Sequence, residues 1–128
     1  MNSLKKIHHV AIICANYEKS KEFYVNKLGL VVLNETYRAD RDSYKLDLAV
    51  GGEYQIELFS FPNSPKRPSY PEACGLRHLA FEVDNMEEAV GKLHANGIDV
   101  ERIRIDPITG KRFTFFADPD GLPVELYE

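Results

Sequence analysis

Cysteine is scarce in this chain of 128 residues, and the two cysteines that are present lie far apart. Cys14 and Cys74 form no Cys-X-X-Cys motif, which argues against a zinc ribbon. We expect both to be free thiols, buried or half-buried, rather than a disulfide. A glycine-rich phosphate loop and a nucleophile elbow are also missing from the sequence.

The chain also has no long apolar segment and no excess of positive charge. Its longest apolar runs, such as VAII, fall far short of the roughly 20 residues that cross a bilayer. The formal net charge of -4 argues against attraction to nucleic acid or to anionic lipid. The first residues, MNSLKKIHH, contain no apolar core of a signal peptide. We therefore expect a cytoplasmic protein with no nucleic-acid partner and no membrane partner.

An internal repeat is the most informative pattern that is present. An offset of 69 residues places IHHVAI on LRHLAF and NYEKS on NMEEA, and an offset of 68 places IEL on VEL. A single-residue insertion or deletion accounts for the difference between the two offsets. The repeat predicts one domain over residues 1–128 made of two copies of one module, residues 1–62 and 74–128, with a proline-rich linker at residues 63–73.

Each copy predicts the order β-α-β-β-β, which makes the fold class α+β. The first helix is expected over residues 17–28, with Asn16 as its N-cap and Gly29 at its end. In the second copy, Asp84 and Glu87 resemble a capping box that opens a helix. The expected strands are residues 7–14, 31–38, 45–50 and 54–61, and then residues 76–83, 99–105, 112–117 and 123–127.

Two histidines and two glutamates recur in register in the two copies. Because side chains alternate along a strand, His9 and His78 are expected on the face opposite the apolar residues that pack under the helices. Glu57 and Glu125 each stand between two apolar residues of the last strand of a copy. His8 falls on the helix side, and we expect it to be a bystander.

A single strand histidine is most often a hydrogen-bonded structural residue, and a single glutamate often faces solvent. Packing would preserve the apolar positions of a duplicated module, but it gives no reason for a repeated His–Glu pair. Two imidazoles and two carboxylates suit a borderline divalent ion such as Ni, Co, Zn, Mn or Fe. We therefore predict that one divalent metal ion is bound by His9, Glu57, His78 and Glu125.

Other residues are candidate substrate contacts, each with a plainer alternative. Phe59 and Phe61 would line an apolar pocket, or they are simply part of the core. Arg38 and Arg112 would bind an anionic group, or they are solvated charges at the sheet rim.

The segments IHHVAI, QIELF, RHLAF and DPDGLPVELYE, in this order in two βαβββ modules, resemble the vicinal oxygen chelate superfamily, which includes glyoxalase I, bleomycin-resistance proteins and dioxygenases. They are most similar to its small bacterial YaeR-type glyoxalase-like group. The resemblance implies an open eight-stranded cup in which the four ligands meet one metal ion. It also implies that Glu125 is the catalytic base and that nickel or cobalt is favoured over zinc or manganese. A homodimer is expected because the exposed sheet edge of a module favours pairing with a second copy.

The resemblance implies a metal-dependent lyase or isomerase, similar to lactoylglutathione lyase, that acts on a small vicinal-oxygen substrate such as a thiol hemithioacetal of a 2-oxoaldehyde. Ile13 and Phe61 stand where glutathione-using members have an arginine and an asparagine. Because apolar side chains cannot bind a charged tripeptide end, glutathione itself is not expected. Two alternatives stay open: another metalloenzyme of the superfamily, such as an epimerase, or a metal-free binding protein of the bleomycin-resistance type.

Overall fold

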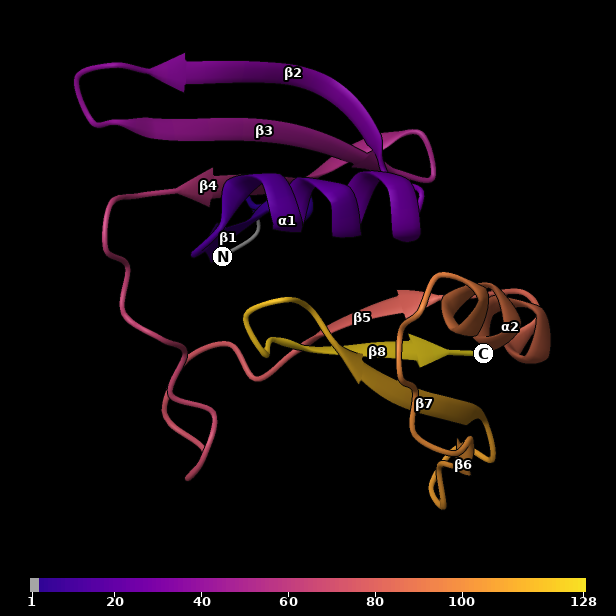
Figure 1. The fold of residues 1–128 in the computed structure, drawn as a ribbon. Helices are drawn as coiled ribbons and strands as arrows, with labels where there is room; N and C mark the ends of the chain where they lie inside the picture. Colours follow the sequence, from indigo (N-terminus) through magenta and orange to yellow (C-terminus); the bar gives the residue numbers. More distant parts are fainter. Residues whose placement is uncertain (1–2) are drawn as a thin grey trace. The chain divides into compact units, whose positions relative to one another are not determined.

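The computed structural model describes residues 3–128, and the chain divides into two compact units. The boundary between Lys66 and Arg67 lies within the proline-rich segment. Each unit contains one helical segment and one four-stranded sheet (Figure 1). The predicted α+β fold class with two βαβββ modules is confirmed.

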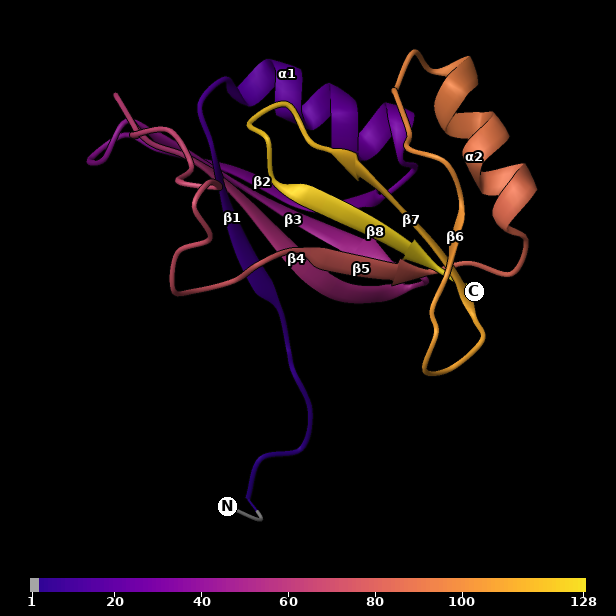
Figure 2. The ribbon, with the colours of Figure 1, turned by 90° about the horizontal axis from the view of Figure 1, so that it is seen from below.

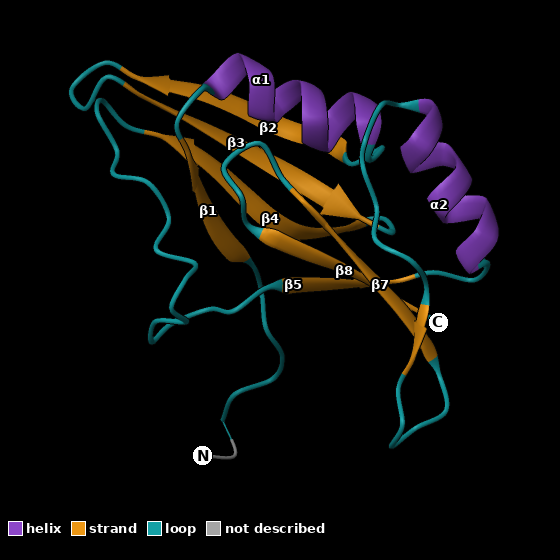
Figure 3. Cartoon of the chain, turned by 60° about the horizontal axis from the view of Figure 1, so that its bottom comes forward, coloured by secondary structure: helices purple, strands orange, loops and turns teal. Residues whose placement is uncertain are grey.

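Unit 1 has a sheet in the order β1-β4-β3-β2, in which β1 and β4 are parallel and the other pairs are antiparallel. The helical segment lies along one face of this sheet (Figure 3), and Tyr17, Phe23 and Tyr24 of this segment are buried. The elements are β1 Val10–Cys14, α1 Tyr17–Lys21, a π-helical continuation Glu22–Lys27, β2 Val31–Arg38, β3 Ser43–Val50 and β4 Glu53–Ser60.

The first helix begins as predicted and then changes type. The Asn16 side chain accepts a hydrogen bond from the Lys19 N–H at 3.1 Å, and Gly29 follows the helix with a φ of 81°. The second half is a π-helix rather than an α-helix, with the Leu28 N–H bonded to the Phe23 carbonyl. The wider turn brings the adjacent Phe23 and Tyr24 onto the buried side together.

Unit 2 repeats the topology, with the sheet order β5-β8-β7-β6 and with β5 parallel to β8. Its helix runs beside its own sheet (Figure 2) and buries Met86 and Leu93. The elements are β5 Leu79–Glu82, α2 Met86–Ala95, β6 Arg104–Ile105, β7 Arg112–Ala117 and β8 Pro123–Tyr127.

Several of the predicted element boundaries are wrong. β1 and β5 begin at Val10 and Leu79, so His9 and His78 each stand one residue before a strand, because parallel pairing with β4 and β8 starts only there. Residues 99–103 are not a strand: the Glu101 N–H bonds the Phe115 carbonyl and its carbonyl accepts from the Thr114 hydroxyl, but regular pairing with β7 covers only Arg104 and Ile105. The cap of α2 is Asn85 rather than Asp84, since the Asn85 side chain accepts from the Glu88 N–H at 2.9 Å.

Burial follows the predicted alternation. Ile12 and Cys14 are buried while Ala11 and Ile13 are exposed, and Val124 and Leu126 are buried on either side of Glu125. Both cysteines are free as predicted, but Cys74 is exposed because it lies in the loop before β5. Within residues 3–128, no helix is long and apolar enough to cross a membrane.

Candidate metal centre

In unit 1, His9, just before β1, faces Glu57 of the neighbouring strand β4. The two strands are parallel with Ala11 opposite Glu57, and His9 stands two residues before Ala11. The Nε2 atom of His9 is 3.2 Å from Oε2 of Glu57. The Glu57 side chain is only 11% exposed, whereas that of His9 is 38% exposed. The carboxylate is therefore nearly enclosed, and the imidazole borders solvent.

The Glu57 carboxylate is held by further polar groups of its own sheet. The Tyr54 hydroxyl donates a hydrogen bond to Oε2 of Glu57, and Nζ of Lys45 lies 3.8 Å from the same oxygen. Lys45 also pairs with Asp47 at 2.7 Å. Burial, followed by the hydrogen bonds to Glu57 and Asp47, raises the pKa of Tyr54. Tyr54 therefore stays a protonated donor and fixes the orientation of Glu57.

His8, which the sequence predicts to be a bystander, contacts His9 directly. Its Nδ1 atom is 2.8 Å from Nδ1 of His9, within hydrogen-bonding distance, and the two rings meet edge to face. The strand ladder begins after both residues, so alternation does not force them onto opposite faces. A hydrogen bond at Nδ1 of His9 leaves Nε2 to face Glu57, which is the usual way a neighbouring group orients a ligating imidazole.

In unit 2, the matching pair is His78 and Glu125. Ala80 stands opposite Glu125 in the parallel pair of β5 and β8, and Nε2 of His78 is 3.9 Å from Oε1 of Glu125. The His78 ring meets Phe115 edge to face, with the centroids 5.0 Å apart. Within residues 3–128 no group donates a hydrogen bond to the Glu125 carboxylate, whose side chain is 15% exposed.

The donor sets suit a divalent metal ion, although each unit supplies only two donors. Two neighbouring ligands bound at 2.0–2.2 Å to one ion are roughly 2.8–3.6 Å apart in octahedral or tetrahedral geometry. The His9–Glu57 separation lies in this range, and the His78–Glu125 separation is slightly wider. Among residues 3–128, no three His, Cys, Asp or Glu side chains are grouped so that they could bind one ion. That all four residues bind one ion therefore stays a prediction, and the structure shows two separate histidine–glutamate pairs.

Three of the four predicted substrate contacts cluster in unit 1. The Arg38 guanidinium carbon lies 4.9 Å from the centre of the Phe59 ring and 5.6 Å from that of Phe61. The two rings are nearly parallel, with centroids 5.9 Å apart. Arg38 also donates to the Ser43 hydroxyl at 2.7 Å, whereas its buried Nε has no hydrogen-bond partner. Since Phe59 is two residues from Glu57 on β4, the cluster lies on the Glu57 side of the sheet.

Arg112, the fourth predicted contact, lies elsewhere. Its guanidinium bonds both carboxylate oxygens of Glu87 and pairs with Glu128 at 2.8 Å. The hydrogen bond to Arg112 lowers the pKa of Glu87 to about 2, and both carboxylates raise the pKa of Arg112. Arg112 thus joins β7 to the first turn of α2 and to the end of the chain after β8.

Sequence reasoning missed Tyr54, Lys45 and Asp47, the polar partners around Glu57. The turn between β3 and β4 pairs Val50 with Glu53, and this register alone would place Asp47 opposite Ile56. A β-bulge after Leu48 shifts the register so that Asp47 stands opposite Glu57, and no sequence pattern indicated this bulge. The three residues were overlooked as partners of Glu57 because they have no polar counterparts in the second module, and only repeated residues were considered as parts of the metal site.

Comparison with known proteins gives close matches over the full length. The chain is 66% identical over 125 residues to the protein YwkD of Bacillus subtilis (strain 168), with 98% of each chain covered. It is 59% identical to the protein YaeR of Escherichia coli (strain K12), covering 100% of this chain and 99% of YaeR. The crystal structure of a glyoxalase family protein from Enterococcus faecalis matches with a TM-score of 0.89 at 54% identity, covering 97% of this chain and 98% of that one.

A more distant relative is the lactoylglutathione lyase of Salmonella typhimurium, which is 29% identical and is aligned over 96% of this chain and 92% of its own. The profile of the Glyoxalase/Bleomycin resistance protein/Dioxygenase superfamily matches residues 6–126, nearly the whole chain. With two βαβββ modules and a histidine–glutamate pair in each, the chain belongs to this superfamily.

Proposed function

We propose that the chain is a divalent-metal-dependent lyase or isomerase of the glyoxalase I type. Its substrate would be a small molecule with oxygens on neighbouring carbons, such as a thiol hemithioacetal of a 2-oxoaldehyde. The observation that carries the proposal is the pair of facing histidine and glutamate donors that recurs at matching positions of both units. His9, Glu57, His78 and Glu125 would bind the ion, with nickel or cobalt favoured over zinc or manganese.

The two glutamates have different roles in this proposal. Glu57 is held by Tyr54 and Lys45, which suits a ligand that stays in place. Glu125 has no hydrogen-bond donor within residues 3–128, which suits a carboxylate that takes a proton from one carbon and returns it to the neighbouring carbon. When bound, a divalent ion would act as a Lewis acid on the substrate oxygens.

The Arg38, Phe59 and Phe61 cluster would contact the remainder of the substrate. Two phenyl rings give an apolar surface, and the guanidinium above them offers donors to an oxygen atom. Glutathione is a poor candidate for the thiol, because Ile13 and Phe61 offer no charged donor at the positions where glutathione-using members have an arginine and an asparagine. The resemblance to the Salmonella lyase therefore supports the type of reaction and leaves the thiol to experiment.

A complete site requires the two half-sites to meet, either within one chain or between two copies in a homodimer. Mixing two inactive variants distinguishes these cases. If sites form between copies, a mixture of His9→Ala and His78→Ala chains contains dimers with one intact site, and activity returns. If sites form within one chain, each mixed dimer still has a defect in both sites, and activity stays lost. Light scattering of the untreated protein gives the number of copies.

The test of the function is metal content followed by an assay. Protein purified without a metal-binding tag should contain about one divalent ion per chain by elemental analysis. A series of thiols with methylglyoxal should then be turned over, and a chelator should abolish the activity. If no ion is bound even after loading with nickel, cobalt, zinc or manganese, the metalloenzyme proposal is wrong, and the metal-free binding protein takes its place.

A further inference from the structure

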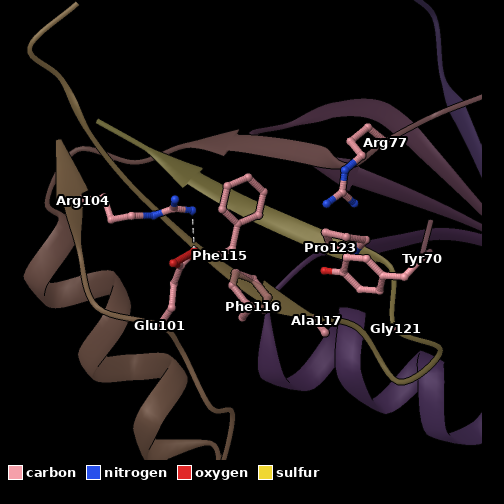
Figure 4. A pocket seen from close by; sticks show the side chains of 9 residues that line it. All are labelled: Tyr70, Arg77, Glu101, Arg104, Phe115, Phe116, Ala117, Gly121 and Pro123. Carbon is pink, nitrogen blue, oxygen red and sulfur yellow. Dashed lines mark hydrogen bonds and ion pairs between the residues drawn. The ribbon is translucent and has the colours of Figure 1, made fainter. Parts of the chain in front are cut away.

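Unit 2 contains a cavity of about 460 Å³ whose lining includes none of the four candidate metal ligands. Its walls come from the loops before β5 and β6, from β7 and from the turn before β8. A volume of this size is typical of a site for a small molecule. The side chains that matter here are Tyr70, Arg77, Glu101, Arg104, Phe115 and Pro123 (Figure 4).

The cavity has an unneutralised positive charge. The Arg104 guanidinium pairs with Glu101 at 2.8 Å and stacks over the Phe113 ring at 4.6 Å, so its charge is compensated. Arg77 has no carboxylate partner anywhere in residues 3–128, and its guanidinium carbon lies 5.9 Å from the centre of the Tyr70 ring. Figure 4 shows the two arginines entering from opposite ends of the cavity, with the Phe115 ring between them.

Hydrogen bonds from Arg67 hold the backbone of Arg77 in place. The Arg67 guanidinium donates to the carbonyls of Leu76 and Arg77, both at 2.9 Å. Arg67 also bonds the Ser69 hydroxyl at 3.0 Å, so one arginine ties the loop of Tyr70 to the residues just before His78. The Arg77 guanidinium is therefore presented from a braced segment, although its side chain is exposed.

The cavity adjoins the half-site of unit 2. Phe115, which lines the cavity, touches the His78 ring and is the register partner of Glu125. Pro123, also in the lining, is two residues from Glu125 on β8 and so lies on the same face. A molecule whose reacting carbons lie at His78 and Glu125 would extend one arm into this cavity.

We propose that this cavity binds an anionic arm of the substrate. Arg77 forms charge-assisted hydrogen bonds with a terminal carboxylate or phosphate, and the apolar stem of the arm packs on Phe115 and Tyr70. This inference rests on the proposed function in one respect, because it treats the occupant as the substrate of the adjacent half-site. It names the substrate class as an acidic adduct, and it places recognition of the acid in the second module instead of at Ile13 and Phe61 of the first.

The test is a binding measurement on metal-free full-length protein, so that it does not depend on turnover. The probes share one phenylpropyl stem and differ in the end group: 3-phenylpropionate, 3-phenylpropyl phosphate and the neutral 3-phenylpropanamide. We expect the anionic probes to bind at least roughly tenfold more tightly than the amide. Arg77→Gln should remove this preference, and Arg77→Lys should keep part of it. Lys92→Gln removes one positive charge from the exposed face of α2 in the same unit and should change nothing.

Each outcome is decisive. Tighter binding of the propionate than of the phosphate identifies a carboxylate arm, and the reverse identifies a phosphate arm. Equal binding of charged and neutral probes, no binding of any probe, or unchanged binding in Arg77→Gln overturns the inference. If the metal and turnover experiments fail but Arg77→Gln still loses the anion, the cavity is an anion site and only the proposed reaction is wrong.

Discussion

Glu57 and Glu125 occupy matching positions in two copies of one module, but their surroundings have diverged. In unit 1, Asp47 of β3 stands opposite Glu57, and in unit 2, Phe115 of β7 stands opposite Glu125. The offset of 68 residues that relates Glu57 to Glu125 also relates Lys45 to Phe113 and Tyr54 to Leu122. The polar residues around the first glutamate are thus replaced by apolar residues around the second.

This comparison shows how a duplicated module can acquire two functions from one backbone. The parallel pairing that places a glutamate beside a histidine is the same in both units, with Ala11 opposite Glu57 and Ala80 opposite Glu125. The side chains around each pair determine how firmly its glutamate is held. The hydrogen bond from the Tyr54 hydroxyl holds Glu57 in one orientation. The neighbours of Glu125 are apolar and restrain its carboxylate less. We infer a fixed ligand in one module and a mobile base in the other.

Exchanging each glutamate for glutamine gives the largest expected effects and the sharpest test of this difference. Glu125→Gln should lose turnover by roughly 10²–10⁴-fold because it removes a general base, and it should still bind a metal ion. Glu57→Gln should lose both metal and turnover, since a fixed ligand is gone. Elemental analysis and steady-state rates measure both. Equal metal loss in the two variants would break the proposed division of roles.

The next largest effect is expected from the hydroxyl group that holds Glu57. Tyr54→Phe should weaken metal binding roughly 10- to 100-fold, because residues that orient a ligand contribute on that scale. Titration with cobalt, followed by its visible absorption, measures the affinity. Tyr37→Phe is the matched control, since the Tyr37 hydroxyl bonds the exposed Asp42 and has no contact with Glu57. If both variants bind cobalt like the unaltered chain, Tyr54 does not orient the ligand.

The fold and the four candidate ligands could be predicted because both are encoded twice. A repeat of apolar positions predicted the βαβββ modules, and the recurrence of His9 as His78 singled out the histidines. Features that occur once left no such signal. Lys45 and Tyr54 have apolar counterparts, and the cavity beside Phe115 combines strand residues with loop residues such as Tyr70 and Arg77, whose positions no periodicity predicts.

The errors in the boundaries have a common physical cause. Apolar alternation in LRHLAF continues before the point where β5 finds a partner, because a side-chain pattern does not report which backbone groups are paired. Residues 99–103 likewise show a strand-like side-chain pattern without regular backbone pairing, and the Glu101 carbonyl accepts a hydrogen bond from the Thr114 hydroxyl. The cap of α2 was misplaced for a different reason, since aspartate and asparagine are comparable caps and adjacent here. The register of NMEEA on NYEKS, which aligns Asn85 with Asn16, was the better guide.

The two helix caps offer a third test, of moderate size, in which the modules should behave alike. Asn16 and Asn85 each accept a hydrogen bond from the N–H three residues later, at 3.1 Å and 2.9 Å. Replacing either with alanine should lower the free energy of unfolding by about 1 kcal/mol. Urea unfolding followed by circular dichroism gives the values. Asp84→Ala is the control and should have little effect, and a larger loss in Asp84→Ala than in Asn85→Ala would restore the predicted capping box.

The smallest expected effect concerns the ion pairs that only the second module has. Glu87 is bonded by Arg112, while Glu18, its counterpart at the offset of 69, has no arginine partner within residues 3–128. Because the pKa of Glu87 falls from 4.5 to about 2 on folding, the unfolded chain takes up its proton first as the pH drops. The stabilisation by Glu87 is therefore complete above pH 4.5 and is lost between pH 4.5 and about 2.

Glu87→Gln should lower the melting temperature slightly at pH 7, and the difference from the unaltered chain should shrink as the pH falls through this range. Glu18→Gln should show no such trend, so a constant difference for Glu87→Gln from pH 7 to pH 2.5 would mean that the ion pair with Arg112 does not persist in solution.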